Sequence, residues 1–474
     1  MIISGHFIDG RWQSATDQSL IEVHNPATGQ IVGAVVAGDQ SAVNQAVLAA
    51  TRGFQAWAAT PMPERIALVD ALAAGLAEHR DEIAETLSAE MGAPIAFARA
   101  AQVGVAIADL NALAAAAKAH VEREAVSNSL VVSEPVGVVG AITPWNFPLH
   151  QIMLKVGAAL LAGCTVVLKP SEVAPLNAVL IGRILDEIGL PAGVVNIVFG
   201  DGAGVGAPLA AHPDIDMVTF TGSRMVGEAV ARAASATITK VALELGGKSA
   251  AIILDDAPLE SAARDVLRSC FANSGQTCAA LTRALVPAHL KDAWGQAIIA
   301  EAANWVPDDP AQEQTILGPL ASELQKERVL AHIRAAIDEG ARLIVGGAEP
   351  VGLEGAYVRP TVFADVTPDM AIFREEVFGP VLAVTTYTTE DEAVALANDS
   401  DYGLAGGVWS ADPQRALAVA LRVRTGTIGI NGAGLDVGAP FGGYKQSGVG
   451  REAGTRGFEE FLEFKAVMGA SSLV

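Results

Sequence analysis

Cysteine is scarce in this sequence, which contains only Cys164, Cys270 and Cys278. So few cysteines cannot build the disulfide framework of a small secreted domain, so reduced thiols in a reducing compartment are expected. The three residues also lack the spacing of metal ligands, and no metal site is predicted. Their interest therefore lies in the reactivity of single thiols.

Basic residues are also few: 31 lysines and arginines stand against 53 aspartates and glutamates, for a formal net charge of -22. This balance argues against nonspecific binding to nucleic acid or to an anionic membrane. No apolar run reaches the roughly 18 residues of a membrane-spanning helix. The N-terminus lacks the basic start and apolar middle of a signal peptide, so a cytoplasmic location is expected.

Hydrophobic residues, in contrast, make up 51% of the 474-residue chain. At roughly 150 residues per domain, this length predicts two or three domains. Short apolar strands alternate with helices from residue 149 onward, and a second alternation begins at residues 250–254. The pattern is typical of parallel sheets covered by helices on both faces. We predict two α/β units in series, the first doubly wound, with a cleft between them.

Turn signals and periodicity predict the individual elements. Asp9–Gly10 predicts an edge hairpin, and the alanine-rich stretch 39–118, broken by three prolines, predicts three long helices. Residues 130–132 predict a strand that ends at Ser133, and the proline-bracketed loop 143–148 cannot be regular structure. The other predicted strands are 136–142, 165–168, 194–199, 217–220, 250–254, 283–286, 343–345, 381–384 and one near 461–467; the other helices are 149–161, 176–188, one from about 204, one from 223 and one ending at 271.

Two glycine clusters follow predicted strands and are candidates for a phosphate site. Gly202–Ala207 formally fits a dinucleotide pattern, but no strand ending in an acidic residue lies about 20 residues further on, so an ordinary turn is favoured. At Gly222–Ser223, the serine can cap a helix whose free amides attract anions, or the cap is merely structural. Lys169 and Glu172 follow another strand end and could bracket a ribose diol or form a solvated turn.

Two further residues could carry chemistry. Glu244 lies between two leucines. A carboxylate among apolar neighbours tends to have a raised pKa, which suits a general base, although a surface glutamate before a turn fits equally well. Cys278 lies in a polar loop, where exposure and function are expected. Cys164 and Cys270 lie at a strand start and in an apolar helix, and are interpreted as buried structural residues.

Taken together and in order, seven segments resemble the aldehyde dehydrogenase superfamily, NAD(P)-dependent enzymes that oxidise aldehydes to carboxylic acids. Each motif alone is weak, but their order along nearly the whole chain makes the resemblance specific. It implies an α/β fold with a Rossmann-type cofactor domain, an α/β catalytic domain and a β oligomerisation extension. The segments are Pro144–Pro148, Lys169–Glu172, Phe220–Ser223, Leu243–Lys248, Gly275–Cys278, Glu375–Pro380 and Pro440–Gly448.

The resemblance also implies catalytic roles. Cys278 would attack the aldehyde carbonyl to give a thiohemiacetal, and covalent catalysis of this kind splits one difficult step into two. The side chain of Asn146 and the backbone N–H of Cys278 would hold the oxyanion. After hydride transfer to NAD, Glu244 would activate the water that hydrolyses the thioester. Lys155 matches a family lysine whose charge lies near the site, without a direct step.

For the cofactor, the resemblance implies that Lys169 and Glu172 bind the adenosine ribose, Ser223 the pyrophosphate and Glu376 the nicotinamide ribose. Because a carboxylate accepts a hydrogen bond from a 2′-hydroxyl but repels a 2′-phosphate, Glu172 predicts NAD over NADP. The remaining cofactor-binding positions predicted by the resemblance are Trp145, Gly222, Leu245, Gly246 and Phe378.

The predicted substrate pocket departs from the usual family pattern. His150, Gln151, Leu154 and Ala272 stand where many relatives carry aromatic or bulky residues, so we expect a wider tunnel of mixed polarity that favours medium-sized or bulky aldehydes over acetaldehyde. No arginine follows Cys278, which disfavours aldehydes with a distal carboxylate. The other predicted pocket residues are Phe147, Thr277, Ala279 and Phe441.

By the same resemblance, residues 1–116 and 136–246 would form the NAD-binding domain, 247–456 the catalytic domain, and 117–135 with 457–474 the oligomerisation segments. Strand pairing across subunits would bury sheet edges in a homodimer or homotetramer.

Three alternatives remain open. The nearest is a CoA-acylating aldehyde dehydrogenase, in which CoA takes the acyl group from Cys278; Glu244 favours hydrolysis instead. The second is a catalytically silent member with a structural or binding role, which the complete set of Asn146, Glu244 and Cys278 disfavours. Reduction of an acyl phosphate also fits Glu244 poorly.

Overall fold

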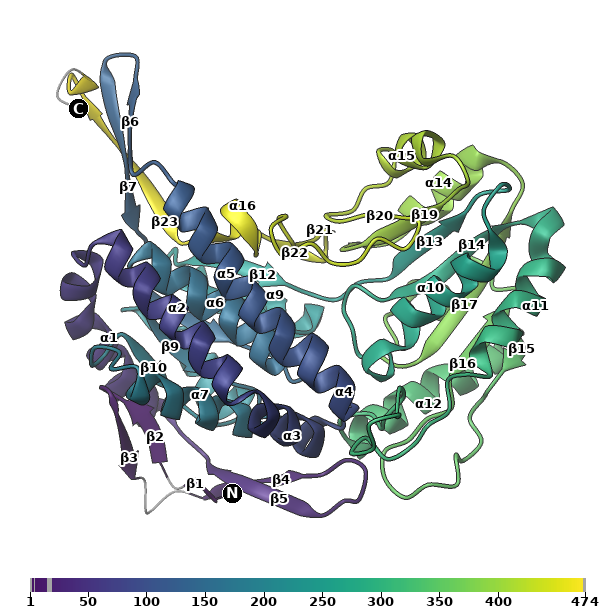
Figure 1. Ribbon diagram of the computed structural model, residues 1–474, viewed down its shortest axis with the longest axis horizontal. Helices are drawn as coiled ribbons and strands as arrows, with labels where there is room; N and C mark the ends of the chain where they lie inside the picture. Colours follow the sequence, from purple (N-terminus) through teal and green to yellow (C-terminus); the bar gives the residue numbers. More distant parts are fainter. Residues whose placement is uncertain (1, 4, 15–18, 472–474) are drawn as a thin grey trace.

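The computed structural model describes residues 2–3, 5–14 and 19–471, and its chain forms two α/β lobes with a projecting β arm (Figure 1). One lobe is built on an eight-stranded sheet and the other on a seven-stranded sheet. The predicted α/β class, with two units in series, is confirmed.

The eight-stranded sheet has the order β22-β12-β11-β8-β9-β10-β2-β3. Its five central strands are parallel, and β22, β2 and β3 pair antiparallel at the edges. From β8 the chain adds β9 and β10 on one side and then β11 and β12 on the other, so the strand order reverses beside β8, where open α/β sheets bind ligands. The strands are β2 (Gly5–Ile8), β3 (Arg11–Ser14), β8 (Val138–Ile142), β9 (Thr165–Lys169), β10 (Val195–Ile197), β11 (Met217–Thr221), β12 (Lys240–Glu244) and β22 (Gly448–Val449).

Several local predictions for this lobe are confirmed and others are corrected. The β2–β3 hairpin turns at Asp9–Gly10 as predicted. Strand β8 begins at Val138 rather than 136, because Gly137 has a φ of 131° and interrupts extended backbone. The helix expected from about residue 204 is a π-helical turn, Gly202–Gly206, followed by the short α8.

The stretch 39–118 contains more helices than the three predicted. Helix α2 begins just after Pro61 and carries Pro63 in its first turn, where a missing N–H costs little. A break without proline, at His79 alone, separates α2 from α3. The helices of this lobe are α1 (Gln40–Ala58), α2 (Met62–Glu78), α3 (Arg80–Met91), α4 (Ile95–Phe97), a π-helical turn (Ala98–Val103), α5 (Gly104–Ala119), α6 (Pro148–Ala162), α7 (Leu176–Glu187), α8 (Ala207–Ala210) and α9 (Arg224–Ala234).

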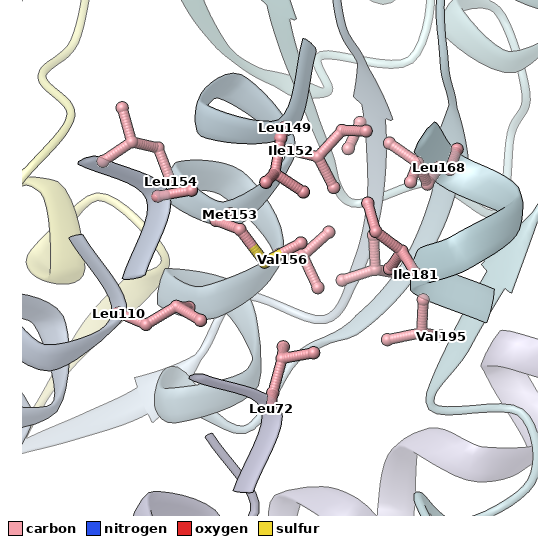
Figure 2. Packing of buried hydrophobic residues seen from close by; sticks show 14 of the residues in the cluster. Leu72, Leu110, Leu149, Ile152, Met153, Leu154, Val156, Leu168, Ile181 and Val195 are labelled. Atoms are coloured by element: carbon pink, nitrogen blue, oxygen red, sulfur yellow. The ribbon is translucent and has the colours of Figure 1, made fainter. Parts of the chain in front are cut away.

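Helix α6 lies in the hydrophobic core of this lobe. Its Ile152, Met153 and Val156 are buried against Leu110 of α5 and Leu72 of α2 (Figure 2). The helical run 95–119 is long and apolar enough to cross a membrane, with a mean hydropathy of 1.4, yet a core helix passes the same test. Because α5 packs against α2, α6 and α16, we interpret it as a core helix.

The second lobe has the strand order β15-β16-β17-β14-β13-β19-β20, and every neighbouring pair except β15–β16 is parallel. Its strands are β13 (Ser249–Ile253), β14 (Leu281–Pro287), β15 (Arg342–Val345), β16 (Thr361–Ala364), β17 (Val381–Tyr387), β19 (Gly406–Trp409) and β20 (Gly429–Ile430). Its helices are α10 (Leu259–Phe271), α11 (Lys291–Ala302), α12 (Glu323–Asp338), α13 (Ala371–Arg374), α14 (Glu390–Asn398) and α15 (Pro413–Ala420), with 3-10 turns at Ala272–Gly275 and Ala288–Leu290.

The arm is a three-stranded antiparallel sheet in the order β23-β7-β6, with β6 (Arg123–Val126), β7 (Ser129–Pro135) and β23 (Leu462–Met468). The prediction that the strand of residues 130–132 ends at Ser133 is wrong: β7 continues to Pro135 because β23 pairs with its whole length. The remaining elements are β1 (Ile2–Ile3), β4 (Leu20–His24) and β5 (Ile31–Val36) in one small sheet, β18 (Tyr402–Gly403) with β21 (Tyr444–Lys445), and α16 (Gly454–Glu459).

The predicted domain boundaries stay a prediction, with one feature added by the topology. Strand β22 lies within residues 247–456, the predicted catalytic segment, yet it pairs with β12 of the other lobe. Part of the segment predicted as catalytic therefore completes the edge of the first sheet.

Candidate active site

Cys278 lies where helix α10 gives way to strand β14. The chain turns sharply there, since Asn273 and Ser274 have φ values of 53° and 57° and Gly275 has 75°. A Cβ at Gly275 would lie 2.1 Å from the backbone carbon of Gly379, so only glycine permits this close approach. Cys278 follows this turn and lines a cavity of about 660 Å³.

The cavity collects residues from segments far apart in the sequence. They come from the β8–α6 loop, the end of β11, the end of β12, the Cys278 loop and the segment before β17. All predicted site residues line this cavity except Lys155, Lys169, Glu172 and Leu154. Those that line it are Cys278, Glu244, Asn146, Trp145, Gly222, Ser223, Leu245, Gly246, Glu376, Phe378, Phe147, His150, Gln151, Ala272, Thr277, Ala279 and Phe441.

The structure corrects the prediction that Leu154 lines the substrate pocket. It is buried among the hydrophobic residues around α6 instead of lining the cavity (Figure 2). One helical turn before it, His150 and Gln151 still face the cavity. The physical reason is that α6 runs from the cavity into the core, so its later residues pack against α5 and the sheet.

Glu244 is the last residue of β12 and its side chain is buried. Neither carboxylate oxygen has a hydrogen-bond partner among the described residues. Burial raises the pKa of this carboxyl well above its usual range, and the nearby charge of Glu452 raises it further, while Lys155 and Arg451 lower it. A group of this kind can accept a proton from water near neutral pH.

Lys155 lies behind the cavity in a buried network rather than on its wall. Its Nζ is paired with the carboxylate of Glu452 and donates to Thr221 Oγ1 at 2.6 Å and to Gln151 Oε1 at 3.4 Å. The lysine charge therefore has a buried partner and acts on Glu244 only through space.

The backbone around Asn146 is held by two side chains that the sequence reasoning missed. Gln102 Nε2 and Asn273 Nδ2 each donate to the Asn146 carbonyl oxygen at 2.9 Å. The Asn146 side chain in turn donates from Nδ2 to the Gln276 carbonyl at 2.9 Å, which uses one of its two N–H groups. Gln102 lies in the π-helical turn 98–103, and π turns recur at functional sites. In the sequence, the signal that could have identified Gln102 was a polar residue within an apolar helical run.

The prediction that Cys278 is an exposed thiol needs revision, because the residue is only partly exposed. Burial raises the pKa of Cys278 to about 12, and the charges of Glu376 and Glu244 contribute to this rise. Cys164 and Cys270 are buried as predicted, and burial raises the pKa of each to about 12. A strongly raised pKa therefore does not distinguish Cys278; its position on the cavity does.

The predicted cofactor residues Ser223, Glu376 and Lys169 each make a contact of their own. Ser223 caps α9 by accepting from the Val226 N–H, which leaves other amides of that first turn free for an anion. Glu376 Oε1 accepts from the Gly247 N–H at 3.0 Å, and burial raises the pKa of Glu376 to about 7. Lys169 Nζ donates to Glu172 Oε2 at 2.9 Å, outside the cavity.

These residues fit a dinucleotide. A Cβ at Gly246 would lie 2.1 Å from Glu376 Oε2, so only glycine leaves room for this carboxylate. The capped N-terminus of α9 suits a pyrophosphate, and the partly exposed Glu172 suits a ribose hydroxyl. The described residues contain no group of three or more histidine, cysteine or acidic side chains able to hold a metal ion.

The rest of the cavity wall is largely apolar and comes partly from residues that sequence reasoning did not select. Phe97 meets Phe147 edge to face at 6.0 Å between ring centroids, and Trp145 meets Phe378 at 5.4 Å. Ala272 and Phe441 belong to this region as predicted positions. The lining residues not selected from the sequence are Phe97, Ala101, Val105, Pro144, Thr221, Ser269, Gln325, Arg328, His332, Val377 and Leu435.

The aldehyde dehydrogenase family model matches residues 12–467 of this chain. The chain belongs to the aldehyde dehydrogenase family. The fold expected from the resemblance is thereby confirmed over nearly its whole length.

Individual members of the family are similar to this chain from end to end. It is 49% identical over 466 residues to the 3-succinoylsemialdehyde-pyridine dehydrogenase of a Pseudomonas species, covering 98% of each chain. A mutant of Pseudomonas syringae aldehyde dehydrogenase C, complexed with NAD+ and octanal, superposes with a TM-score of 0.97 at 43% identity, covering 98% of this chain and 97% of that one. A Mycobacterium tuberculosis aldehyde dehydrogenase complexed with NAD+ has a TM-score of 0.96 at 43% identity, covering 99% and 98%.

Proposed function

We propose that this protein oxidises an aldehyde to a carboxylic acid, using NAD+ as the hydride acceptor and water as the second substrate. One observation carries the proposal: Cys278, Asn146 and Glu244, from three separate segments, line one cavity. Acyl transfer through a thioester requires a nucleophile, a hydrogen-bond donor for the oxyanion and a base. The base here is a buried carboxylate that has no hydrogen-bond partner among the described residues.

In the first step the thiol of Cys278 loses its proton to solvent, its sulfur forms a bond to the aldehyde carbon, and the carbonyl π electrons move to oxygen. That oxyanion needs donors where its charge develops. The second N–H of the Asn146 amide is available for it, as is the backbone N–H of Cys278, which donates to no acceptor in the described part of the chain. Gln102 and Asn273 orient the amide by fixing the Asn146 backbone.

In the second half of the reaction the acyl group leaves the sulfur. Bound near Ser223 and Glu376, NAD+ would supply the hydride acceptor for this oxidation. Glu244 then accepts a proton from the attacking water, the C–S bond breaks, and Cys278 regains its thiol. Because burial raises the pKa of Glu244, its carboxylate is basic enough to help this step.

We also propose a preference for NAD over NADP. Glu172 is ion-paired with Lys169 at 2.9 Å and remains partly exposed, so its second oxygen can accept from a ribose hydroxyl. A 2′-phosphate at that place would meet a carboxylate of the same charge. NAD+ is the cofactor in both solved relatives described above, which supports NAD binding here.

For the substrate we propose a medium-sized or bulky aldehyde. The cavity of about 660 Å³ also contains the predicted cofactor residues, and the part lined by Phe97, Phe147 and Phe441 offers an apolar wall to a hydrocarbon or aromatic substrate. The relatives point the same way, since one is named for a pyridine-bearing semialdehyde and another was solved with octanal. An aldehyde that fills the cavity would exclude water from Cys278 until the acyl group has formed.

The test is an NADH-coupled screen of aliphatic and aromatic aldehydes, with Cys278→Ala as the blank. We expect NADH and the free acid in equal amounts, without any need for CoA, and a higher kcat/KM for long or aromatic aldehydes than for acetaldehyde. NADH formation that depends on CoA and yields an acyl-CoA would replace hydrolysis with CoA acylation. No NADH formation across the panel would mean that the protein is a silent family member.

We further propose that the β arm pairs with a second copy of the chain in a homodimer or homotetramer. Strand β23 lies at the edge of the arm, and most of its side chains, including Phe464 and Met468, are exposed. An open edge with exposed apolar side chains gains stability from a partner strand or surface.

A further inference from the structure

Gln151 on α6 presents a free amide nitrogen to the active-site cavity. The residue is 4% exposed and lines the cavity that also contains Cys278. Its Oε1 accepts from Thr221 Oγ1 at 2.9 Å and from Lys155 Nζ at 3.4 Å. Its Nε2 has no hydrogen-bond partner in the described part of the chain. The donor end of a buried amide is therefore left for a group inside the cavity.

The contacts of the amide decide which of its two ends faces the cavity. An ammonium can only donate, so the amide atom that contacts Lys155 is the oxygen. Thr221 Oγ1 accepts from the same ammonium at 2.6 Å, which turns its own hydrogen towards Gln151 Oε1. Because an amide does not titrate near neutral pH, its N–H groups stay donors whatever the protonation of the groups around it.

The hydroxyl of Thr221 places this amide beside Glu244. Thr221 ends β11 and is the register partner of Glu244 at the end of β12. Paired residues of parallel strands direct their side chains to the same face of the sheet, and both residues line the cavity. The charge of Lys155, which contacts the amide, also acts on Glu244. Gln151 therefore reaches the cavity on the side of the proposed base.

The amide and the carboxylate together complement a water molecule. Neither oxygen of Glu244 has a hydrogen-bond partner among the described residues, so the amide of Gln151 does not donate to it. A buried donor and a buried acceptor that share a cavity without bonding to each other are each left for a third group. Water satisfies both, because it donates to the carboxylate and accepts from the amide. A carbonyl or ether oxygen of the substrate would satisfy the amide alone.

We propose that Gln151 binds the hydrolytic water, donating its Nε2–H to the water oxygen while Glu244 accepts a water hydrogen. The amide then holds one lone pair of the water and leaves the other to attack the acyl carbon. The water oxygen forms the new C–O bond, its proton passes to Glu244, the C–S bond breaks, and the sulfur of Cys278 takes a proton to become the thiol. The inference rests on the proposed function and adds a residue to its hydrolytic step. Lys155 and Thr221 act through Gln151 as positioning residues.

The test is Gln151→Met, which keeps the length of the side chain and removes its N–H groups. Intact-protein mass spectrometry after an acid quench measures the fraction of enzyme that carries the acyl group on Cys278 during turnover. We expect deacylation to slow by about tenfold, as for the loss of one neutral hydrogen bond, so the acylated fraction should rise and kcat should fall. The first-turnover rate of NADH formation should stay that of the wild type, because the water acts only after the thioester has formed.

An added small thiol, mercaptoethanol, separates a defect in water binding from a general structural defect. Its thiolate attacks the thioester directly and needs neither Gln151 nor Glu244. It should therefore remove the acyl group from Gln151→Met as the mercaptoethanol thioester and restore NADH turnover towards the wild-type rate. A variant whose cavity was merely distorted would form the thioester slowly, and the thiol could not accelerate that step.

Replacing Thr221 gives a matched pair of variants that leave Gln151 in place. Thr221→Val removes the hydroxyl that orients the amide and should raise the acylated fraction, though less than Gln151→Met does. Thr221→Ser keeps a hydroxyl and should retain the wild-type fraction. The pair tests the inference even if the methionine variant does not fold.

An unchanged acylated fraction in Gln151→Met would overturn the inference and leave the proposed function standing. A first-turnover rate that falls as much as kcat would do the same, since Gln151 would then act before the thioester exists. Equal acylated fractions in Thr221→Val and Thr221→Ser would overturn the orienting role of the hydroxyl. Absence of NADH and acyl-enzyme in the wild type with every aldehyde would refute the proposed function together with the inference.

Discussion

Replacing Glu244 with glutamine separates the two halves of the proposed reaction. Glutamine has nearly the shape of glutamate, and shape matters here because a Cβ added at Gly442 would lie only 2.5 Å from Glu244 Oε1. The variant removes the proton-accepting group and leaves the cavity wall filled. Glu244→Gln should therefore slow hydrolysis of the thioester without blocking its formation.

The magnitude follows from the role of a general base. Such a base contributes about 10² to 10⁴ in rate, which is about 3 to 5 kcal/mol of barrier, so steady-state turnover should fall by that factor. Thioester formation should not fall with it. The charge of Glu244 is one of the causes that raise the pKa of Cys278, so its removal lowers that pKa and favours the thiolate.

The assay is stopped-flow NADH absorbance with excess aldehyde. The variant should release close to one NADH per active site in a burst, followed by slow turnover, which is the kinetic sign of an accumulating acyl-enzyme. Wild-type turnover should decline as pH falls through the raised pKa of Glu244, because the protonated acid cannot accept a proton. The slow turnover of the variant should lose that dependence.

Glu90→Gln is the matched control for neutralising a buried carboxylate. Glu90 lies on α3, and its oxygens accept from the N–H groups of Leu176 and Asn177, away from the cavity. Replacing Glu90 should lower the free energy of unfolding of the protein. The ratio of burst amplitude to steady-state turnover should remain that of the wild type. A Glu244→Gln enzyme that is folded but shows neither burst nor turnover would refute the assignment, because Glu244 would then be needed to form the thioester.

Three other substitutions test separate parts of the proposal. Glu172→Ser should raise kcat/KM with NADP relative to NAD by about tenfold or more, since it removes a like charge facing the 2′-phosphate; an unchanged ratio in cofactor kinetics would exclude Glu172 as the determinant. Gln102→Leu removes a donor to the Asn146 carbonyl and should lower kcat by about tenfold with little change in the KM for NAD, and equal kinetics to wild type would argue against positioning. Phe464→Glu, at a residue that is 58% exposed, should shift the molar mass from light scattering towards that of the monomer, whereas Leu421→Glu, directly after α15, should not; an unchanged oligomer in the first variant would locate the interface elsewhere.

The order of strands and helices could be predicted because each local pattern agreed with the fold. Short apolar strands between amphipathic helices gave the parallel core, and Ser223 was recognisable as a helix cap before any coordinates. The errors lie where tertiary contacts override local signals. No breaker residue marks the end of α2 at His79, and β7 continues to Pro135 because β23 supplies its hydrogen bonds.

The catalytic residues of the site were easier to predict from the sequence than the residues that support them. Motifs selected Cys278, Glu244 and Asn146, since the chemistry restricts which residue types can act. The supporting residues carry no such restriction: Gln102 and Asn273 meet at the Asn146 carbonyl from segments about 170 positions apart, and only the folded chain brings them together. Leu154 shows the opposite error, in which closeness in sequence to His150 suggested a place on the cavity wall that the direction of α6 does not allow.

The surroundings of Cys278 change how its reactivity is to be understood. A loop position suggested an exposed, reactive thiol, but burial together with the charges of Glu376 and Glu244 raises its pKa to about 12. At neutral pH the free protein therefore holds a protonated thiol, which is a poor nucleophile and resists oxidation. Activation has to come from a change in local charge, either a proton bound by one of the two carboxyls or a positive group brought into the cavity. Because both acids line the cavity together with Cys278, a ligand that neutralises either charge would lower the pKa of the thiol.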